Sequence, residues 1–266
     1  MEAPTVDRAG AQYWDAVWAD AAQAGRMDPA TPGFRNHVGR AFADLFAPIL
    51  PDQPFELLEV GCARSHWLPY FAHEHGARVC GLDYSAIGCD VERAILRDAE
   101  VDGEIICGDL FDPPPVLTNR FDVVISFGVE HFDDTAAVVR ALREYLKPDG
   151  ILVTVAPNMV GAIGLIERCI NRRVYDLHVR LTPRDLAKAH ADAGLTVHAA
   201  HYFLSTNFGV LNTNGLDERS RMTRAKLALC VNLGRVSKGI WTIEELVRPL
   251  KPTRIFAPYL VVTARR

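Results

Sequence analysis

The sequence has 266 residues, of which 49% are hydrophobic and 23% charged, and it is long enough to bury one large core, with or without a cap. Its formal net charge is −4 at pH 7, and no dense basic run with interleaved aromatic residues occurs, which disfavours nucleic acid as a partner. No stretch approaches about 18 uninterrupted apolar residues, and the polar start is not a signal peptide, so we expect a cytoplasmic protein that does not enter a membrane.

Charge is divided unevenly between the two halves of the chain. Residues 1–150 carry 12 Lys and Arg against 25 Asp and Glu, whereas residues 151–266 carry 17 against 8. The first half therefore suits a cationic ligand, and the second favours an anionic one. The alternative is that both kinds of charge only coat solvated helix faces. The six cysteines show no Cys-x-x-Cys pair and no His/Cys spacing suited to zinc, so we expect neither disulfides nor a metal site.

Apolar residues at helical spacing predict a first helix over residues 10–24, with Tyr13, Trp14 and Trp18 among its aromatic residues. A second helix is predicted over residues 34–46. Short apolar runs then alternate with helical patterns, which is typical of a parallel sheet covered by helices. The predicted strands are 57–60, 79–82, 105–107, 123–126 and 151–155, and the helices between them are 67–75, 86–99 and 134–146.

The last third of the chain interrupts this alternation. A helix over 161–170, a basic loop, a capped helix from 182 to 194 and a strand over 196–204 are predicted. The next strand, 256–263, arrives only some fifty residues later, after helical segments over 219–237 and 242–250. We therefore divide the chain into an N-terminal helical lid (1–50), a core (51–204 and 254–266) and a helical insertion (205–253) that forms part of a substrate cap.

Two strand ends carry the most informative motif. Leu-Leu-Glu-Val-Gly at 57–61 ends in an acid and a glycine, and Gly-Leu-Asp-Tyr-Ser at 81–85 places Asp83 22 positions after Gly61. A glycine lets backbone approach a ligand, and a carboxylate at the next strand tip can bind a ribose diol. Asp83 could instead only cap the following helix. A pyrophosphate turn needs three glycines where this chain has one, and Glu59 would repel phosphate but suits a cation.

With these runs the chain resembles a class I S-adenosylmethionine-dependent methyltransferase, of the branch that modifies small molecules such as natural products. The matching segments follow the family's order and spacing: 55–85, Gly-Asp-Leu at 108–110, 121–131 and 146–153. The resemblance implies a doubly wound, seven-stranded, mostly parallel sheet of Rossmann-like type with a helical cap. Ala63 and Ser65 stand where the family has small glycines, which leaves the loop geometry open.

The resemblance also implies which residues hold S-adenosyl-L-methionine. Asp109 would accept from the adenine amino group, and Leu110 would offer an adjacent backbone N–H, while Phe127 would line the methionine portion. Aromatic residues of the first helix resemble the lid of related enzymes, although such a face is more often core packing. The full expected cofactor set is Tyr13, Trp18, Glu59, Gly61, Cys62, Ala63, Asp83, Tyr84, Asp109, Leu110 and Phe127.

For catalysis, His131 is the natural candidate base, since an imidazole pKa near 6.5 suits proton removal at neutral pH. Some relatives pair such a histidine with a tyrosine of the N-terminal helix, a part that Tyr13 could play. The alternative is that His131 only packs or starts a helix.

The expected reaction is methyl transfer to an oxygen or nitrogen of a small molecule, in bacterial secondary metabolism. Nine Lys and Arg against four acids in 217–254 favour an anionic acceptor, and the loop with Tyr175, Asp176, His178 and Arg180 is expected to overhang it. We expect a monomer or homodimer. The alternatives are an inactive cofactor-binding regulator or partner protein, and a nicotinamide-dependent oxidoreductase, which the single glycine of the turn opposes.

Overall fold

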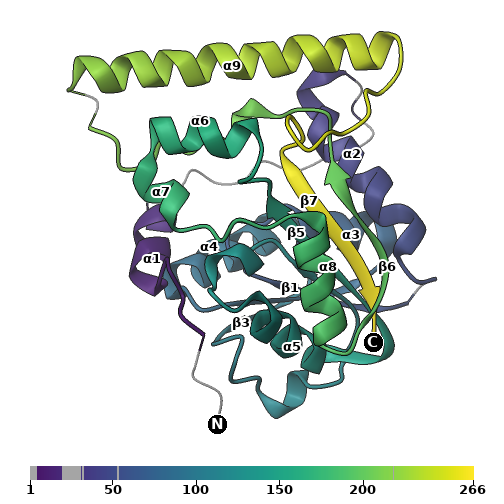
Figure 1. The fold of residues 1–266 in the computed structure, drawn as a ribbon. Coiled ribbons are helices and arrows are strands. Elements are labelled where there is room, and N and C mark those ends of the chain that lie inside the picture. Colours follow the sequence, from purple (N-terminus) through teal and green to yellow (C-terminus); the bar gives the residue numbers. More distant parts are fainter. Residues whose placement is uncertain (1–4, 20–30, 32, 53, 218) are drawn as a thin grey trace.

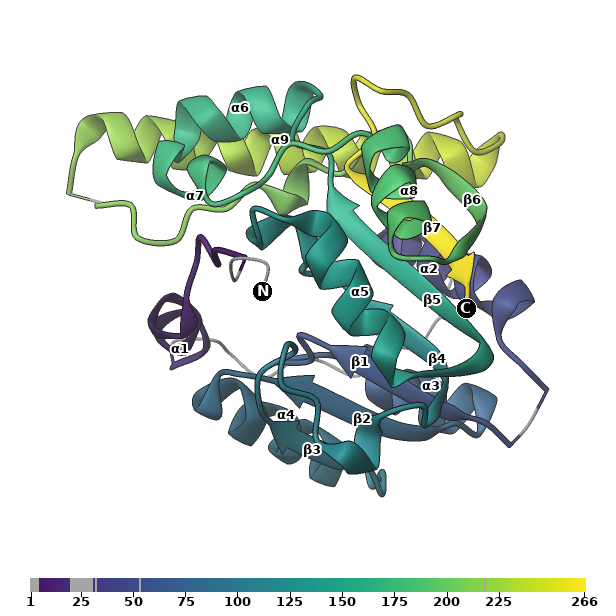
Figure 2. The same cartoon turned by 60° about the horizontal axis from the view of Figure 1, so that its bottom comes forward.

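The computed structural model describes residues 5–19, 31, 33–52, 54–217 and 219–266. Its centre is a seven-stranded sheet in the order β3-β2-β1-β4-β5-β7-β6, visible edge to edge in Figures 1 and 2. β1 to β5 pair in parallel, and β7 runs antiparallel to both β5 and β6. The predicted doubly wound, mostly parallel fold is confirmed. The strands are β1 (Glu56–Val60), β2 (Arg78–Asp83), β3 (Glu104–Cys107), β4 (Phe121–Ser126), β5 (Leu146–Pro157), β6 (Thr196–Phe203) and β7 (Tyr259–Arg265).

Helices cover both faces of this sheet because successive strand residues bury their side chains on opposite sides. On one face Leu58 and Val124 join a core with α5 and α8, and on the other Leu57 and Val123 join a core with α2, α3 and α4. Figure 2 shows these two helical layers with the strands between them. The helices concerned are α2 (His37–Phe46), α3 (Trp67–His75), α4 (Ala86–Asp98), α5 (Thr135–Tyr145) and α8 (Pro183–Asp192).

A third group of helices lies beyond the carboxyl end of β5. α6, α7 and α9 run close together there in both views (Figures 1 and 2), and Ile163, Ile170, Phe208 and Leu211 form a small core between them. This group closes over the end of the sheet at which the parallel strands finish. The elements are α6 (Ala162–Ile170), α7 (Arg172–Asp176), α9 (Arg221–Leu246) and the short 3₁₀ helix η5 (Phe208–Val210).

The N-terminal segment crosses the same end of the sheet. Arg8 donates its backbone N–H to His131 O (2.9 Å), and Asp133 donates to Val6 O (3.0 Å), so this segment is held against the loop after β4. α1 (Ala11–Ala19) then docks on α4, where Ser85 Oγ donates to Asp15 Oδ1 (2.5 Å). The predicted first helix continues to residue 24, and its part beyond Ala19 lies outside the described residues. The other 3₁₀ helices are η1 (Phe34–Asn36), η2 (Ala47–Ile49), η3 (Pro115–Leu117) and η4 (Val129–His131).

The insertion between β6 and β7 differs from the prediction of two helices. One helix, α9, runs unbroken over 221–246 because tertiary anchors hold its far end. Trp241 Nε1 donates to Thr206 O (2.9 Å), and the Trp241 ring stacks on His37 at 5.4 Å between centroids. Arg40 adds an ion pair with Glu245. In the part of the chain that the structure describes, no helix, α9 included, is long and apolar enough to span a membrane.

The bounds of three other segments also differ from those predicted from the sequence. The predicted basic loop contains the short helix α7, whose N-terminus is capped where Val174 N donates to Asn171 Oδ1. The last strand begins at Tyr259 and not at residue 256, because Ala257 N closes a turn onto Thr253 O (2.9 Å). β5 extends beyond 151–155 on both sides, since Leu146 pairs with Phe121 of β4 and the pairing with β7 continues as far as Pro157.

Candidate active site

A pocket of about 320 Å³ lies at the carboxyl ends of β1, β2 and β4. The sheet order reverses here, because β2 lies on one side of β1 and β4 on the other, and open α/β sheets bind ligands at such a switch point. Strand-end residues form its floor, and Trp14 and Trp18 of α1 line it from the N-terminal side. We call this the cofactor pocket.

The turn after β1 leaves room for a ligand. Gly61 has φ +78°, where a side chain is disfavoured, and apart from its chain neighbours no residue lies within 4 Å of the place that a Cβ would take. Its N–H donates to Leu82 O (2.8 Å), which ties β1 to β2. Arg64 also adopts a positive φ of 59°, although it is not a glycine. The loop therefore keeps its tight geometry without the family's further glycines.

Two buried acids support this turn. Glu59 is 3% exposed and accepts from Ser65 Oγ (2.6 Å), and Glu92 Oε2 accepts from Ser65 N (2.7 Å). Burial raises the pKa of Glu59 to about 8 and that of Glu92 to about 9, and each acid opposes ionisation of the other acids nearby. The expected acid at Glu59 is thus present but mainly protonated at neutral pH. A cationic ligand would favour its ionised form.

Asp83 closes the pocket at the tip of β2. Its Oδ2 accepts from Ala63 N (3.0 Å), and its Oδ1 accepts from Ser85 N (2.9 Å), so both oxygens are fixed by the backbone. Burial is the main cause of a pKa raised above the usual aspartate value. Each carboxylate oxygen keeps a second lone pair, which allows it to accept from a diol as well. Tyr84 also lines the pocket, and its hydroxyl donates to Asp7 Oδ2 (2.8 Å).

The structure does not bring every expected cofactor residue to the wall of this pocket. Ala63, Leu110 and Phe127 line it, whereas Cys62, Asp109 and Tyr13 do not. Cys62 is fully buried beneath the turn, against Gly81. The Asp109 carboxylate is exposed and accepts from Phe111 N (2.9 Å) in a local turn. Contact of these three residues with the cofactor therefore stays a prediction.

The aromatic residues of α1 separate into two directions. Trp14 and Trp18 stack at 5.5 Å between centroids and face the cofactor pocket, and Trp18 approaches Gly88 closely because that residue has no side chain. Trp14 also meets the His131 ring edge-on at 5.1 Å. Tyr13 lies near the Asn212 side chain and does not line the cofactor pocket. The His131 partner from the N-terminal helix is thus Trp14 and not the expected Tyr13.

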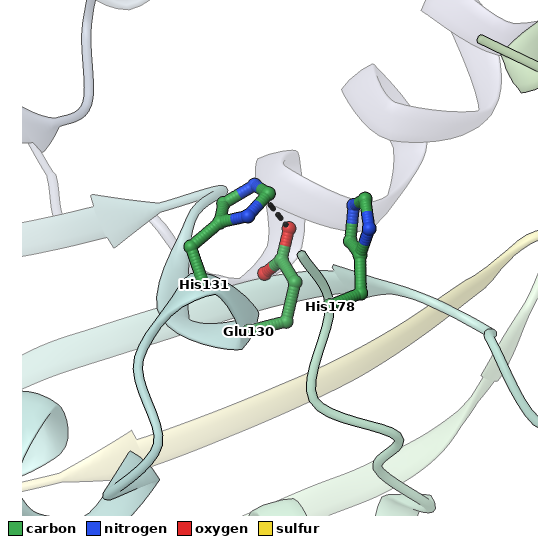
Figure 3. A group of neighbouring side chains, drawn as sticks. All are labelled: Glu130, His131 and His178. Carbon is green, nitrogen blue, oxygen red and sulfur yellow. Dashed lines mark ion pairs between the residues drawn. The ribbon is translucent and has the colours of Figure 1, made fainter. Parts of the chain in front are cut away.

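His131 belongs to a compact cluster with Glu130 and His178, drawn in Figure 3. His131 Nε2 lies 3.5 Å from Glu130 Oε1, and the two imidazole rings are 4.7 Å apart. Burial lowers the pKa of His131 to about 3, with His178 adding to the effect, and burial raises the pKa of Glu130 to about 8. An imidazole with so low a pKa is a weak proton acceptor, which opposes His131 as an unaided base. We call these three residues the His–Glu cluster.

A second cavity of about 250 Å³ adjoins the cofactor pocket, and Phe127 lines both. Its walls are mostly apolar, from β5, α6 and Tyr259, and His178 lies at its edge. Glu167 is its most unusual polar group, at 3% exposure: Oε2 accepts from Asn212 N (2.9 Å), and Oε1 is buried without a hydrogen-bond partner. Burial raises the pKa of Glu167 to about 7.

The basic residues of the second half of the chain lie elsewhere. Among the described residues that line the two cavities, none is a Lys or Arg from 172–184 or 217–254. Arg172 pairs with Asp176 (2.9 Å), and Lys226 Nζ donates to Ile170 O (2.9 Å). Arg184, Lys251 and Arg254 line a separate depression beside β6. An anionic acceptor therefore gains no support from the cavity walls.

Sequence reasoning missed several residues of the site. Ser65 donates to both Glu59 and Glu92. His66 and Trp67 line the cofactor pocket, and Glu167 lines the second cavity. Ser65, His66 and Trp67 follow Gly61 closely in the chain, so their position alone could have indicated that they belong to the site. Glu92 and Glu167 gave none, because each lies on a helix whose acids are ordinarily solvated.

Comparison with known proteins identifies the family. A family model described as a methyltransferase domain matches residues 34–200. The ubiquinone biosynthesis O-methyltransferase of Neisseria meningitidis is 29% identical over 154 residues, which cover 53% of this chain and 63% of that protein. The chain thus spans somewhat less than two thirds of that relative.

Two solved structures share the fold at low identity. The geranyl diphosphate C-methyltransferase of Streptomyces coelicolor, in complex with Mg²⁺, geranyl diphosphate and S-adenosyl-L-homocysteine, has a TM-score of 0.61 and 15% identity, covering 99% of this chain and 100% of that one. The [4+2]-cyclase SpnF also has a TM-score of 0.61, with 18% identity and coverage of 99% and 97%.

The chain belongs to the class I S-adenosylmethionine-dependent methyltransferases. Its site fits that cofactor: the open turn at Gly61 leaves space, and the buried acids Glu59 and Asp83 suit a cation and a diol. Because the chain belongs to this family, the alternative of a nicotinamide-dependent oxidoreductase is abandoned.

Proposed function

We propose that this protein transfers a methyl group from S-adenosyl-L-methionine to an oxygen or nitrogen of a small molecule. The observation that carries the proposal is the contact between two cavities at Phe127, one with the polar features of a nucleoside site and one mostly apolar. Such an arrangement holds a donor and an acceptor end to end, and orientation of this kind contributes about 7 kcal/mol or more to lowering a barrier.

Each part of the chain has a defined task in this proposal. Asp83 binds the ribose, and Glu59 balances the positive charge of the cofactor. Trp14 and Trp18 of α1 exclude water from the cofactor pocket. Bound S-adenosyl-L-methionine supplies an activated methyl group on a sulfonium sulfur. The second cavity orients the acceptor, with Glu167 Oε1 free to accept a hydrogen bond from a hydroxyl or amine. That polar group favours a neutral or cationic acceptor over an anionic one.

Two features support an O-acceptor in particular. The Neisseria relative is by name an O-methyltransferase, and the His–Glu cluster stands between the two cavities, where a hydroxyl proton would have to leave. The role of His131 as the base remains a prediction, as do work in bacterial secondary metabolism, a cytoplasmic location and a monomeric or homodimeric state.

The direct test measures transfer. The full chain is incubated with methyl-labelled S-adenosyl-L-methionine and with hydroxyl, amine and carboxylate acceptors, and S-adenosylhomocysteine and methylated product are followed by mass spectrometry. We expect turnover with members of the first two groups. A chain that binds the cofactor but forms no S-adenosylhomocysteine with any acceptor would instead be a cofactor-binding partner protein, an alternative that the cyclase with this fold keeps open.

A matched pair of variants tests the second cavity. Ile163 is 2% exposed and lines it, whereas Leu165, two positions on in the same helix, is 63% exposed. Ile163→Phe should lower kcat/KM for the acceptor at least tenfold and leave cofactor affinity unchanged, and Leu165→Phe should change neither. Equal behaviour of the two variants would place the acceptor elsewhere.

A further inference from the structure

The His–Glu cluster has the composition of a metal centre. Glu130, His131 and His178 each offer one ligand atom, and these atoms all lie within 4.8 Å of one another. Figure 3 shows the Glu130 carboxyl group between the two imidazole rings. Two histidines and one carboxylate form a common ligand set for divalent transition metals, which leaves coordination positions open for a substrate.

The cluster is buried and incompletely satisfied. Glu130 is 3% exposed and its Oε2 has no hydrogen-bond partner, and His131, at 8%, has none at Nδ1. The Leu177 backbone lies near that ring without making a hydrogen bond. Buried polar atoms without partners are unusual, because each forfeits its hydration. A cation bound to the Glu130 carboxyl group would balance its charge in this buried place, with the His131 ring facing that carboxyl group through Nε2.

His178 is already oriented as metal-bound histidines usually are. Its Nδ1 pairs with the carbonyl oxygen of Val174 (2.8 Å), which leaves Nε2 with a free lone pair. A second hydrogen bond of this kind fixes the ring and its tautomer in known metal sites. The loop that carries His178 is itself held to the cluster, since Val179 N donates to Glu130 O (2.7 Å).

The three ligand atoms would have to move only slightly closer together to bind one ion. Two atoms bound to one ion at about 2.1 Å lie roughly 3.0–3.4 Å apart. Glu130 Oε1 and His131 Nε2, at 3.5 Å, nearly meet this already. The remaining ligand atoms, all within 4.8 Å of one another, would have to approach by at most roughly 1.4–1.8 Å, which rotation about side-chain bonds supplies.

We propose that Glu130, His131 and His178 bind a divalent first-row transition-metal ion between the cofactor pocket and the second cavity. Sequence spacing does not indicate this site, because Glu130 and His131 lie 47 or more positions before His178 and no zinc-type spacing joins them. Two imidazole ligands favour Mn²⁺, Fe²⁺, Co²⁺ or Zn²⁺ over Mg²⁺ and Ca²⁺, which prefer oxygen.

The position of the ion suggests its chemical role. This role rests on the proposed methyl transfer. His131 lines the cofactor pocket and His178 the second cavity, so an ion held by both would lie between the two spaces. An acceptor hydroxyl oxygen bound to it would lose its proton to water more readily. The oxygen then forms the bond to the methyl carbon, and the sulfur keeps the electron pair of the bond that breaks.

The test uses the full chain, stripped with a chelator and titrated with Co²⁺ and separately with Zn²⁺. We expect one equivalent to bind, with visible d–d absorption for Co²⁺ and heat release for Zn²⁺. His178→Ala and Glu130→Gln should each weaken binding on the order of 100-fold. His198→Ala, an exposed histidine on β6, is the matched control and should bind as the wild type does.

Melting curves and S-adenosyl-L-homocysteine binding show that each variant is folded. Wild-type protein that binds neither metal, or variants that bind both as tightly as the wild type, would overturn the metal site. Cofactor binding is measured in the same samples without metal. Its loss would count against the proposed function, and its presence without metal binding would count against the metal site alone.

Discussion

Replacing Glu59 by Gln should remove a pH dependence from cofactor binding. Burial raises the pKa of Glu59 to about 8, so at pH 7 roughly one molecule in ten carries the ionised form. A cationic ligand that pairs with the carboxylate selects this form. Binding at pH 7 should therefore release close to one proton from this group, and affinity should rise with pH until the carboxyl group is fully ionised.

The size of the effect follows from the same pKa. Below pH 7 the ionised fraction falls about tenfold per pH unit, so wild-type affinity should fall by about tenfold between pH 7 and pH 6. Above about pH 9 it should level off. The Gln variant carries no charge at this position at any pH, so the two proteins should converge near pH 6 and separate by about 100-fold at pH 9.

The assay is calorimetric titration with S-adenosyl-L-methionine in buffers of different ionisation enthalpy. The comparison with Glu59→Gln is necessary because the ligand's own amino group titrates in the same range, and because Asp83 and Glu92 face Glu59. Subtracting the variant isolates the proton from Glu59. Parallel pH profiles for the two proteins would refute the reasoning, and melting curves confirm that the variant is folded.

Three further predictions concern single side chains. Asp83→Asn should weaken cofactor binding by about 10- to 100-fold with the fold intact, since charged hydrogen bonds are worth about 1.5–3 kcal/mol; calorimetry showing unchanged affinity would remove Asp83 from the ribose site. Cofactor should change tryptophan fluorescence, and Trp14→Ala with Trp18→Ala should remove most of that change and leave only the part from Trp67; a change of undiminished size after the double substitution would mean that α1 is no lid. His131→Ala removes a ligand of the proposed metal ion and should lower kcat by about 10²-fold or more, with cofactor affinity within a few-fold. A smaller loss in kcat would mean that His131 only packs against Trp14.

Local signals account for what the sequence predicted well. Gly61 and Asp83 end buried strands, and the carboxyl ends of neighbouring parallel strands meet at one edge, so their proximity followed from the alternation of strands and helices. The approach of Trp14 to His131 could not be predicted in this way, because it depends on how α1 docks. The expected partner was Tyr13, one position away, and a single residue on a helix turns a side chain by about 100°.

Tertiary packing also decided the parts of the fold that were predicted wrongly. α9 passes through Gly234 and Gly239 without a break, although glycine weakens helices, because Trp241 and Glu244 are buried against neighbouring segments. The partners of Glu92 and Glu167 come from distant loops in the same manner. No window of sequence around these acids shows that they are buried.

A structure of the chain with S-adenosyl-L-homocysteine bound tests the central claim most directly. We expect the ribose at Asp83, the amino acid portion near Gly61 and Glu59, and the sulfur facing Phe127 and the second cavity. A ligand bound outside the cofactor pocket, or a sulfur sealed off from the second cavity, would contradict it.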